Sequence, residues 1–167
     1  MKKIFLMRHA KSSWKDPGLT DDERPLKKRG RKDAKRMAKV LEANDLFPDL
    51  ILCSSARRAV ETVEILVETL GYENEIIYSD TLYMGEPGDF IEALKTLDND
   101  IETVMIVAHN PGLEAYVQII DGEIESMPTA ALGHMVLSLE DWQELSFETL
   151  GDMVGYWTPK TLEVKHK

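Results

Sequence analysis

The run Ile4-Phe5-Leu6-Met7-Arg8-His9-Ala10-Lys11-Ser12-Ser13-Trp14 decides how the rest of the chain is interpreted. Its apolar part, residues 4–7, is too short for a typical helix and ends abruptly at Arg8 and His9. This pattern predicts a buried β-strand that delivers two side chains to the loop at its C-terminal end. In open α/β sheets, ligands bind at that edge. Arginine offers a planar fork to a phosphate or carboxylate, and histidine can act as a nucleophile or an acid–base group near neutral pH.

The composition limits the classes of protein to consider. The 167 residues suit one domain, 1–167, with a core of its own. No apolar run is long enough for a membrane span, and the run after Lys3 is too short for the core of a signal peptide. The single cysteine, Cys53, excludes an intrachain disulfide framework and is typical of the reducing cytoplasm. The formal net charge of -10 argues against broad nucleic-acid binding, but it does not exclude a local anion site.

Beyond the first strand, helix-like and strand-like patterns alternate. Apolar spacing predicts helices over 30–44, 56–70, 90–97 and 113–120, and short apolar runs predict strands over 49–55, 75–78, 103–108, 131–139 and 144–150. Ser55 is the expected N-cap of the helix over 56–70, and the residues after 150 are expected to form a tail. The alternation predicts an α/β fold, a three-layer sandwich with a mainly parallel central sheet and helices on both faces. The last two strands would add an antiparallel edge.

Basic side chains follow three of the predicted strands. Arg8 and His9 end the first, Arg57 and Arg58 lie in the first turn of the next helix, and His109 follows the strand over 103–108. Cations at a helix N-terminus oppose the helix dipole, which indicates an anion nearby. Because parallel strands end at one edge, these groups can converge. Without a carboxylate the set is a poor metal site, so we expect no metal and no other cofactor. It suits phosphoryl transfer, in which arginines bind the non-bridging oxygens and a histidine attacks phosphorus.

The two histidines have different expected states. A nucleophilic His9 must be neutral, and nearby arginines lower its pKa from the usual value of about 6.5. A bound phosphate dianion would instead favour a protonated His109. Arg24, in the polar loop 15–28, is a third arginine that could face the pocket, and a solvated surface arginine is the alternative. Trp14 and Tyr83 could line the mouth, or only pack locally.

Other hydrolase signatures do not match this chain. A cysteine-dependent phosphatase places arginine six positions after its nucleophile, whereas Ala59 holds that place after Cys53. Neither a Gly-x-x-x-x-Gly-Lys nucleotide-binding loop nor the Gly-x-Ser-x-Gly of serine hydrolases occurs. We therefore interpret Cys53 as a buried strand residue.

These motifs together resemble the histidine phosphatase, or phosphoglycerate mutase-like, superfamily over about residues 4–140. The resemblance rests on Arg8-His9, on the stretch Ser54-Ser55-Ala56-Arg57-Arg58-Ala59-x-x-Thr62 and on His109. Ala10 replaces the usual glycine after Arg-His, as in the short SixA-like phosphohistidine phosphatase branch. The segments 22–26 and 109–111 also resemble that branch. The resemblance implies that Arg8, Arg58 and His109 form the phosphate pocket and that His9 is transiently phosphorylated.

The resemblance also directs attention to an acidic proton donor after the third strand. Glu86 is the nearest candidate and Asp80 the next, with a solvated loop carboxylate as the alternative. A weak donor would suit a phosphoramidate, whose nitrogen can be protonated before cleavage. The chain is too short for a large capping insertion, so the pocket is expected to be open to a phosphorylated protein. The sequence therefore predicts a phosphohistidine phosphatase acting on a protein. The alternatives are a phosphatase for a small phosphate ester and a phosphate-binding module without turnover.

Overall fold

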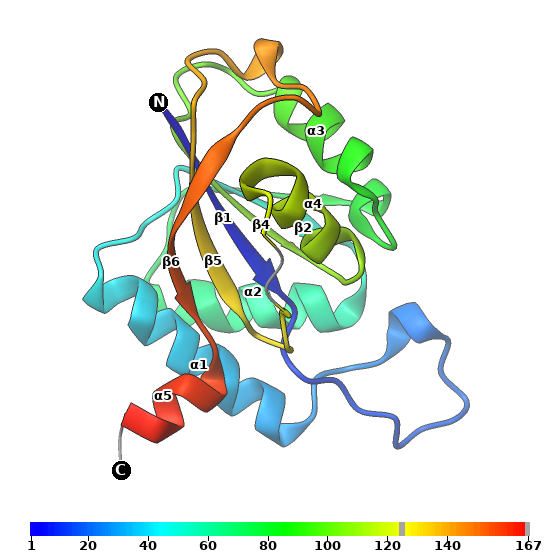
Figure 1. Cartoon of the computed structure of the whole chain (residues 1–167). Helices are drawn as coiled ribbons and strands as arrows, with labels where there is room; N and C mark the ends of the chain where they lie inside the picture. The colour runs from blue at the N-terminus through cyan, green and yellow to red at the C-terminus, as the bar shows by residue number, and fades with distance from the viewer. Residues whose placement is uncertain (124–125, 166–167) are drawn as a thin grey trace.

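A six-stranded sheet organises the computed structural model, which describes residues 1–123 and 126–165 (Figure 1). The strand order is β3-β2-β4-β1-β5-β6. The strands β3, β2, β4 and β1 pair in parallel, whereas β5 pairs antiparallel with β1 and β6 pairs antiparallel with β5. This arrangement confirms the predicted mainly parallel sheet with an antiparallel edge. The strands are β1 Lys2–Arg8, β2 Leu50–Ser54, β3 Glu75–Ser79, β4 Thr103–Ala108, β5 Leu132–Leu137 and β6 Gly151–Trp157.

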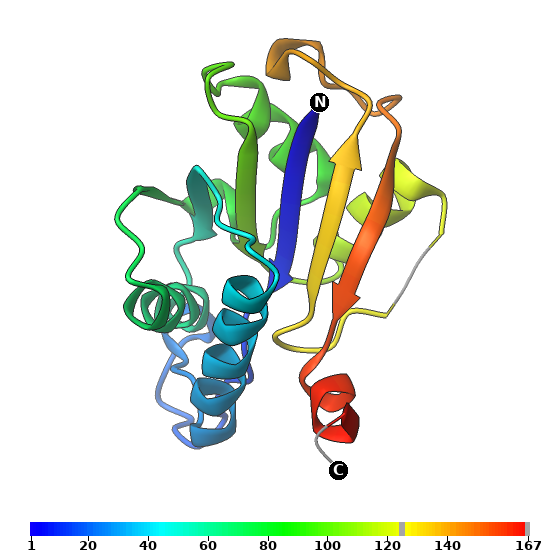
Figure 2. The same ribbon diagram turned by 90° about the vertical axis from the view of Figure 1, so that its left-hand side faces the viewer.

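Helices cover both faces of the sheet (Figures 1 and 2). Alternate side chains of a strand point to opposite faces, so Ile4 and Leu6 pack under α3 and α4, whereas Phe5 and Met7 pack under α1 and α2. The helix α5 follows β6 and contacts α1. The helices are α1 Lys28–Ala43, α2 Arg57–Leu70, α3 Pro87–Lys95, α4 Gly112–Asp121 and α5 Pro159–Lys165, with short 3-10 turns at Asp21–Glu23, Asp80–Leu82 and Trp142–Glu144. None of them has the length and apolar character that a bilayer crossing requires, over the residues described.

The last predicted strand was wrong: β6 spans 151–157 rather than 144–150. Trp142 is fully buried, and its indole N–H donates to the Ile101 carbonyl oxygen at 2.6 Å, which fixes a turn where the strand was expected. Pairing with β5 then begins at Gly151, where a Cβ atom would lie only 2.5 Å from the Val136 carbonyl oxygen. The two strands approach so closely at this point that glycine is required there. The strand therefore forms in a glycine-containing segment, although glycine has a low β-strand propensity.

Two smaller expectations were also wrong. The N-cap of α2 is Ala56 rather than Ser55, and the Ala56 N–H donates to the Ser54 hydroxyl at 3.2 Å. The predicted tail after residue 150 holds both β6 and α5.

Candidate active site

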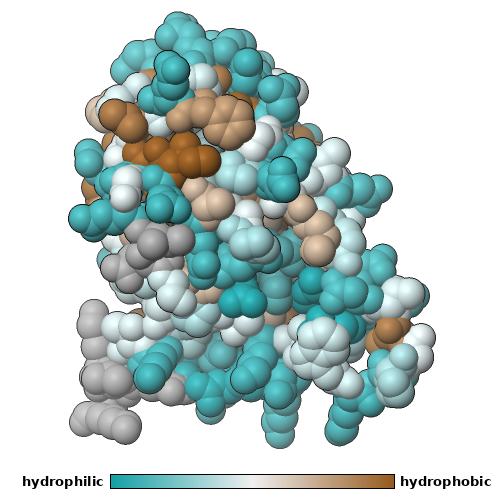
Figure 3. All heavy atoms as spheres, turned by 45° about the vertical axis from the view of Figure 1, so that its right-hand side comes forward, coloured by the Kyte–Doolittle hydropathy of each residue, from teal (hydrophilic) through white to brown (hydrophobic). Residues whose placement is uncertain are grey.

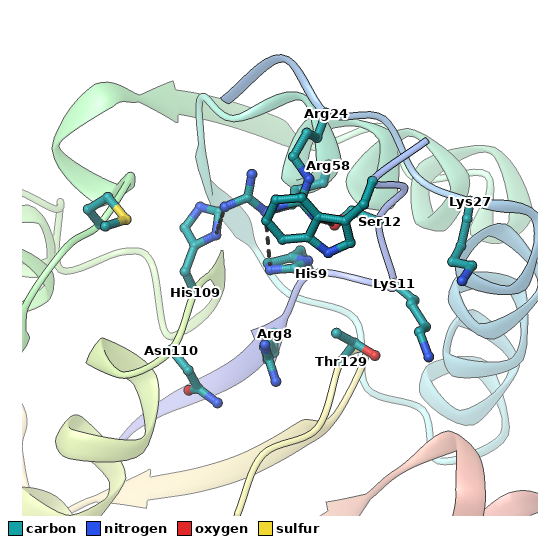
Figure 4. A pocket seen from close by; sticks show the side chains of 12 residues that line it. Arg8, His9, Lys11, Ser12, Arg24, Lys27, Arg58, His109, Asn110 and Thr129 are labelled. Carbon is teal, nitrogen blue, oxygen red and sulfur yellow. Dashed lines mark hydrogen bonds between the residues drawn. The ribbon is translucent and has the colours of Figure 1, made fainter. Parts of the chain in front are cut away.

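A pocket of about 290 Å³ lies where β1 and β4 end, beside the N-terminus of α2 (Figure 4). The structure brings six residues singled out in the sequence to its lining. They are Arg8, His9, Trp14, Arg24, Arg58 and His109. Lys11, Ser12, Lys27, Met84, Asn110 and Thr129 complete it. Parallel strands ending at one edge thus unite groups that lie about fifty residues apart in the chain, as expected for this class of sheet.

The loop after β1 fixes the imidazole of His9, which is only 6% exposed. Nδ1 lies 2.8 Å from the Ala10 carbonyl oxygen. A carbonyl can only accept, so Nδ1 carries the proton and Nε2 keeps the lone pair. The loop is tied to α2, because the Ala10 N–H donates to the Thr62 hydroxyl at 3.0 Å and that hydroxyl donates to the Arg58 carbonyl at 2.7 Å. The ring is therefore held with Nε2 as its free nitrogen.

The Arg58 guanidinium lies between the two pocket histidines (Figure 4). Its Nε–H donates to Nε2 of His9 at 3.3 Å, and its Nη2 lies 3.4 Å from Nδ1 of His109. On its outer side, Nη1 donates to the Asp21 carbonyl at 2.8 Å and Nη2 pairs with the Asp21 carboxylate at 3.0 Å. The side chain is 6% exposed, so four contacts hold a cation beside the lone pair of His9.

Ser54, which the sequence indicated as a strand end and as the first residue of the motif 54–62, orients His109. Its hydroxyl is fully buried and lies 2.7 Å from Nε2 of His109. Because an arginine N–H can only donate, Nδ1 of His109 accepts from Arg58, and its Nε2–H donates to Ser54. The centroids of the two imidazole rings are 5.0 Å apart. His109 therefore presents Nδ1 to the same space as Nε2 of His9.

Both pocket histidines are neutral at pH 7. Burial lowers the pKa of His9 to about 3, against the opposing effect of its hydrogen bond with the Ala10 carbonyl, and the charges of Arg58 and Arg8 lower it further. Burial also lowers the pKa of His109 to about 4, with Arg58 as the second cause. The low pKa of His9 was predicted from the arginines, whereas burial is the larger cause.

Arg8 lies on the opposite side of His9 from Arg58 (Figure 4). Its Nη1 donates to the Met127 carbonyl at 3.0 Å, and the same carbonyl accepts from the Asn110 amide at 2.9 Å. The Asn110 amide also donates to Glu114 at 2.8 Å. The Met127 carbonyl, in the segment between α4 and β5, therefore positions Arg8, and Asn110 in the loop after β4 donates to the same oxygen.

Arg24 lines the pocket, but most of its donors are used within the loop 11–27. Nε donates to the Ser13 carbonyl at 3.1 Å, Nη1 pairs with Asp21 at 2.9 Å, and Nη2 donates to the Ser12 hydroxyl. The guanidinium carbon lies 3.2 Å from the centroid of the Trp14 ring. Arg24 is therefore a buried organiser of this loop rather than a solvated surface residue.

Asp21 was not identified from the sequence, although it directly precedes the segment 22–26. Its carboxylate contacts Arg24, Arg58 and the Tyr83 hydroxyl, which donates to it at 2.6 Å. The Tyr83 hydrogen bond, followed by the two arginines, lowers the pKa of Asp21 to about 2. Asp21 is therefore ionised and acts as an acceptor for Arg58, not as an acid.

The structure does not bring Glu86 or Asp80 to the pocket. Both are exposed, and Glu86 stands at the start of α3, where its backbone N–H donates to Asp89 at 2.8 Å. Among the described residues that line the pocket, none is acidic. Cys53 lies in β2 outside the lining, and burial raises the pKa of its thiol. The described residues also hold no cluster of three or more His, Cys, Asp or Glu arranged for a metal ion.

A family model described as the histidine phosphatase superfamily (branch 1) matches residues 4–83. This segment holds Arg8, His9 and Arg58, whereas His109 lies beyond it. An uncharacterised chloroplast protein of Arabidopsis thaliana is 30% identical over 152 residues, which cover 86% of this chain and 70% of the relative.

Solved structures share the fold. A structure of the protein histidine phosphatase SixA complexed with tungstate has a TM-score of 0.82 at 23% identity, covering 96% of this chain and 99% of that one. SixA from Agrobacterium tumefaciens, a candidate phosphohistidine phosphatase, has a TM-score of 0.81 at 25% identity, with 95% and 98% covered. A mycobacterial glucosyl-3-phosphoglycerate phosphatase has a TM-score of 0.70 at 15% identity, with 95% and 99% covered.

Proposed function

Because this chain belongs to the histidine phosphatase superfamily, branch 1, we propose that it hydrolyses phosphohistidine on a protein through a phosphohistidine formed on His9. One observation carries the proposal. Nε2 of His9 keeps its lone pair in a buried pocket, with the guanidinium of Arg58 donating to it at 3.3 Å. A neutral nucleophile beside fixed cations is what attack on a phosphoryl group requires.

In the first step a phosphoryl group enters between Arg8, Arg58 and His109, and the two arginines donate to its non-bridging oxygens. The oxygens take over the Arg58 Nε–H, because that hydrogen bond otherwise occupies the lone pair of His9. Nε2 then attacks phosphorus in line, the bond from phosphorus to the leaving group breaks, and the leaving group takes up a proton. The dianion raises the pKa of His109, so that its Nδ1 can gain a proton and donate to the phosphoryl group.

In the second step water attacks phosphorus and the bond to Nε2 breaks. The water proton leaves with orthophosphate or to solvent, and His9 returns to its neutral form. The hydrogen bond from Nδ1 to the Ala10 carbonyl supports both steps, because it stabilises the positive charge on the ring while Nε2 carries the phosphoryl group.

The nature of the leaving group favours phosphohistidine over an alkyl phosphate. Among the described residues no carboxylic acid lines the pocket to protonate an alkoxide. An imidazole leaving group needs less help, because solvent can protonate the ring nitrogen that is not bonded to phosphorus before the bond breaks, and neutral imidazole then leaves. The Agrobacterium neighbour, described as a phosphohistidine phosphatase candidate, supports the same substrate. A small phosphate ester is the second candidate, since the fold is shared with a glucosyl-3-phosphoglycerate phosphatase.

The test compares kcat/KM for a phosphohistidine-bearing carrier protein with kcat/KM for a panel of small phosphate esters, each with and without EDTA. We expect the carrier to be preferred and the chelator to have no effect, because histidine and arginine perform every step of the proposed chemistry. Preference for an ester would support the second candidate. Chelator-sensitive turnover would contradict the metal-free mechanism, and binding without turnover of any substrate would identify a phosphate-binding module.

A further inference from the structure

Two more cavities adjoin the catalytic pocket, and each shares lining residues with it. The first, about 410 Å³, shares Trp14 and Lys27 with the pocket and continues along Lys15 and Lys28. The second, about 390 Å³, shares Lys11 and Thr129 with the pocket and continues to Thr158 and Lys160. Together the three adjoining cavities form a trough that extends beyond the catalytic pocket and offers more space than a single phosphoryl group needs.

The exposed side chains along this trough are mostly cationic. Lys11, Lys15, Lys27, Lys28 and Lys160 are all exposed. In Figure 4, Lys11 and Lys27 lie on the side of His9 away from His109. The lower part of the face in Figure 3 is predominantly hydrophilic.

Acidic side chains contribute little to the trough. The single acidic residue among the described residues of its lining is Asp33, whose buried carboxylate pairs with Arg29 at 3.3 Å. A chain of net charge -10 therefore concentrates positive charge around one opening. Such a local field attracts acidic partners and has little effect on the rest of the surface.

Trp14 stands where the trough meets the pocket. Its side chain is 77% exposed, yet the guanidinium of Arg24 lies 3.2 Å from its ring centroid. Arg24 is itself held by the Ser13 carbonyl and by Asp21. The indole is thus an exposed aromatic surface on a fixed support, and aromatic residues held in this way are frequent anchors in protein interfaces.

We propose that this trough binds an acidic polypeptide segment that flanks the phosphorylated residue of a partner protein. This inference rests on the proposed function and specifies its partner. Extended negative charge next to the phosphoryl group would lie on the lysines, and Trp14 would pack against the chain that enters the pocket. A polypeptide fits better than a nucleic acid, because the overall charge of -10 repels a long polyanion.

The test measures binding without turnover. Fluorescence anisotropy follows labelled peptides that carry a stable phosphonate analogue of phosphohistidine, flanked by Asp and Glu, by Ser and Gly, or by Lys and Arg. The variant Lys15→Glu/Lys28→Glu reverses two charges that line only the outer trough. The control Lys35→Glu/Lys39→Glu reverses two lysines further along α1, outside all three cavities. Each variant changes the net charge equally, from -10 to -14, by two units for each substitution.

The wild-type chain is expected to bind the acidic peptide about tenfold more tightly than the Ser/Gly peptide, and the difference is expected to shrink as salt rises. The trough variant should lose this preference, and the control should keep it. Equal affinity for the three peptides, or an equal loss in the control, would overturn the inference. Tighter binding of a single-stranded oligonucleotide than of the acidic peptide would overturn it too.

The two proposals fail separately. Preference for the acidic peptide in a protein that does not hydrolyse a phosphohistidine carrier would refute the proposed substrate and uphold the docking surface. Hydrolysis of the carrier without any preference among the peptides would uphold the substrate and refute the docking surface.

Discussion

Lowering the pH from about 8 to about 5 tests whether the fold holds His9 and His109 neutral. Both are buried, and their pKa values are lowered to about 3 and about 4. In the unfolded chain both titrate near pH 6.5. Between these values the unfolded state binds more protons than the folded state, so stability is complete above about pH 6.5 and is lost as the pH falls.

The size of the loss follows from the width of this window. Each pH unit below about 6.5 costs about 1.4 kcal/mol for each histidine that stays neutral in the folded state. At pH 5 the loss is about 2 kcal/mol for each, or about 4 kcal/mol for the pair. That is a large part of the stability of a typical domain, which is about 5–15 kcal/mol.

Urea unfolding at several pH values measures this loss. The variant His9→Asn removes one of the two titrating groups, so its stability should fall by about 2 kcal/mol less than that of the wild type over the same range. The measured pH range ends at pH 5 because the stability contributed by ionised carboxylates such as Asp21, whose pKa is lowered to about 2, is lost only at more acidic pH. Stability that is flat from pH 8 to pH 5, or an undiminished slope in His9→Asn, would refute the neutral histidines.

Three further predictions concern the pocket and its supports. Arg58→Ala should lower kcat/KM about 10²–10³-fold, by analogy with the loss of one oxyanion donor. Arg57→Ala changes the exposed neighbour in α2, and its kcat/KM should stay within about twofold of the wild-type value. Equal losses of kcat/KM in steady-state assays would reject the assignment of Arg58. Ser54→Ala removes the hydroxyl that His109 contacts, so it should lower the free energy of unfolding in urea by about 1–2 kcal/mol and kcat/KM by about tenfold. Ser55→Ala serves as the exposed control. Unchanged kinetics in Ser54→Ala would show that the serine does not position the histidine. Gly30→Ala places a Cβ atom against the backbone of the loop after β1, where a close contact leaves no room. Thermal unfolding should show that the free energy of unfolding falls by about 1–3 kcal/mol. Wild-type stability would mean that this loop moves freely.

Much of the fold could be predicted because its signals are local. The run at 4–7 is too short for a helix. It lies in a strand whose two faces are both covered by helices, so every one of its positions is apolar. The parallel arrangement of the strands then predicted the site. Because β1 and β4 are parallel neighbours, the segments that follow them lie at the same edge of the sheet, and Arg8, His9 and His109 meet there. The pattern at 144–150 predicted a strand equally well, but the buried Trp142 and the close pairing at Gly151 moved β6 along the chain.

Parts of the site that depend on tertiary pairing were not visible in the sequence. Asp21 lies in a polar loop without periodicity, and its partner Arg58 is 37 residues away. Ser54 resembled any small residue at a strand end, and its contact with His109 spans 55 residues. Glu86 was the first candidate because the family resemblance implies an acidic proton donor in the loop after β3. The structure instead places it at the start of α3, where its backbone joins the helix cap. Its role as proton donor remains an untested prediction.

The most direct test of the account is to trap the covalent intermediate. The chain is mixed with a phosphohistidine-bearing carrier, quenched within one turnover at alkaline pH, where phosphohistidine survives, and digested for mass spectrometry. We expect one added phosphoryl group on the peptide that contains His9. It should be lost in His9→Ala and retained when His134, which packs against Phe5 in the sheet, is changed to Asn. Turnover with the phosphoryl group on another residue, or undiminished turnover in His9→Ala, would contradict it.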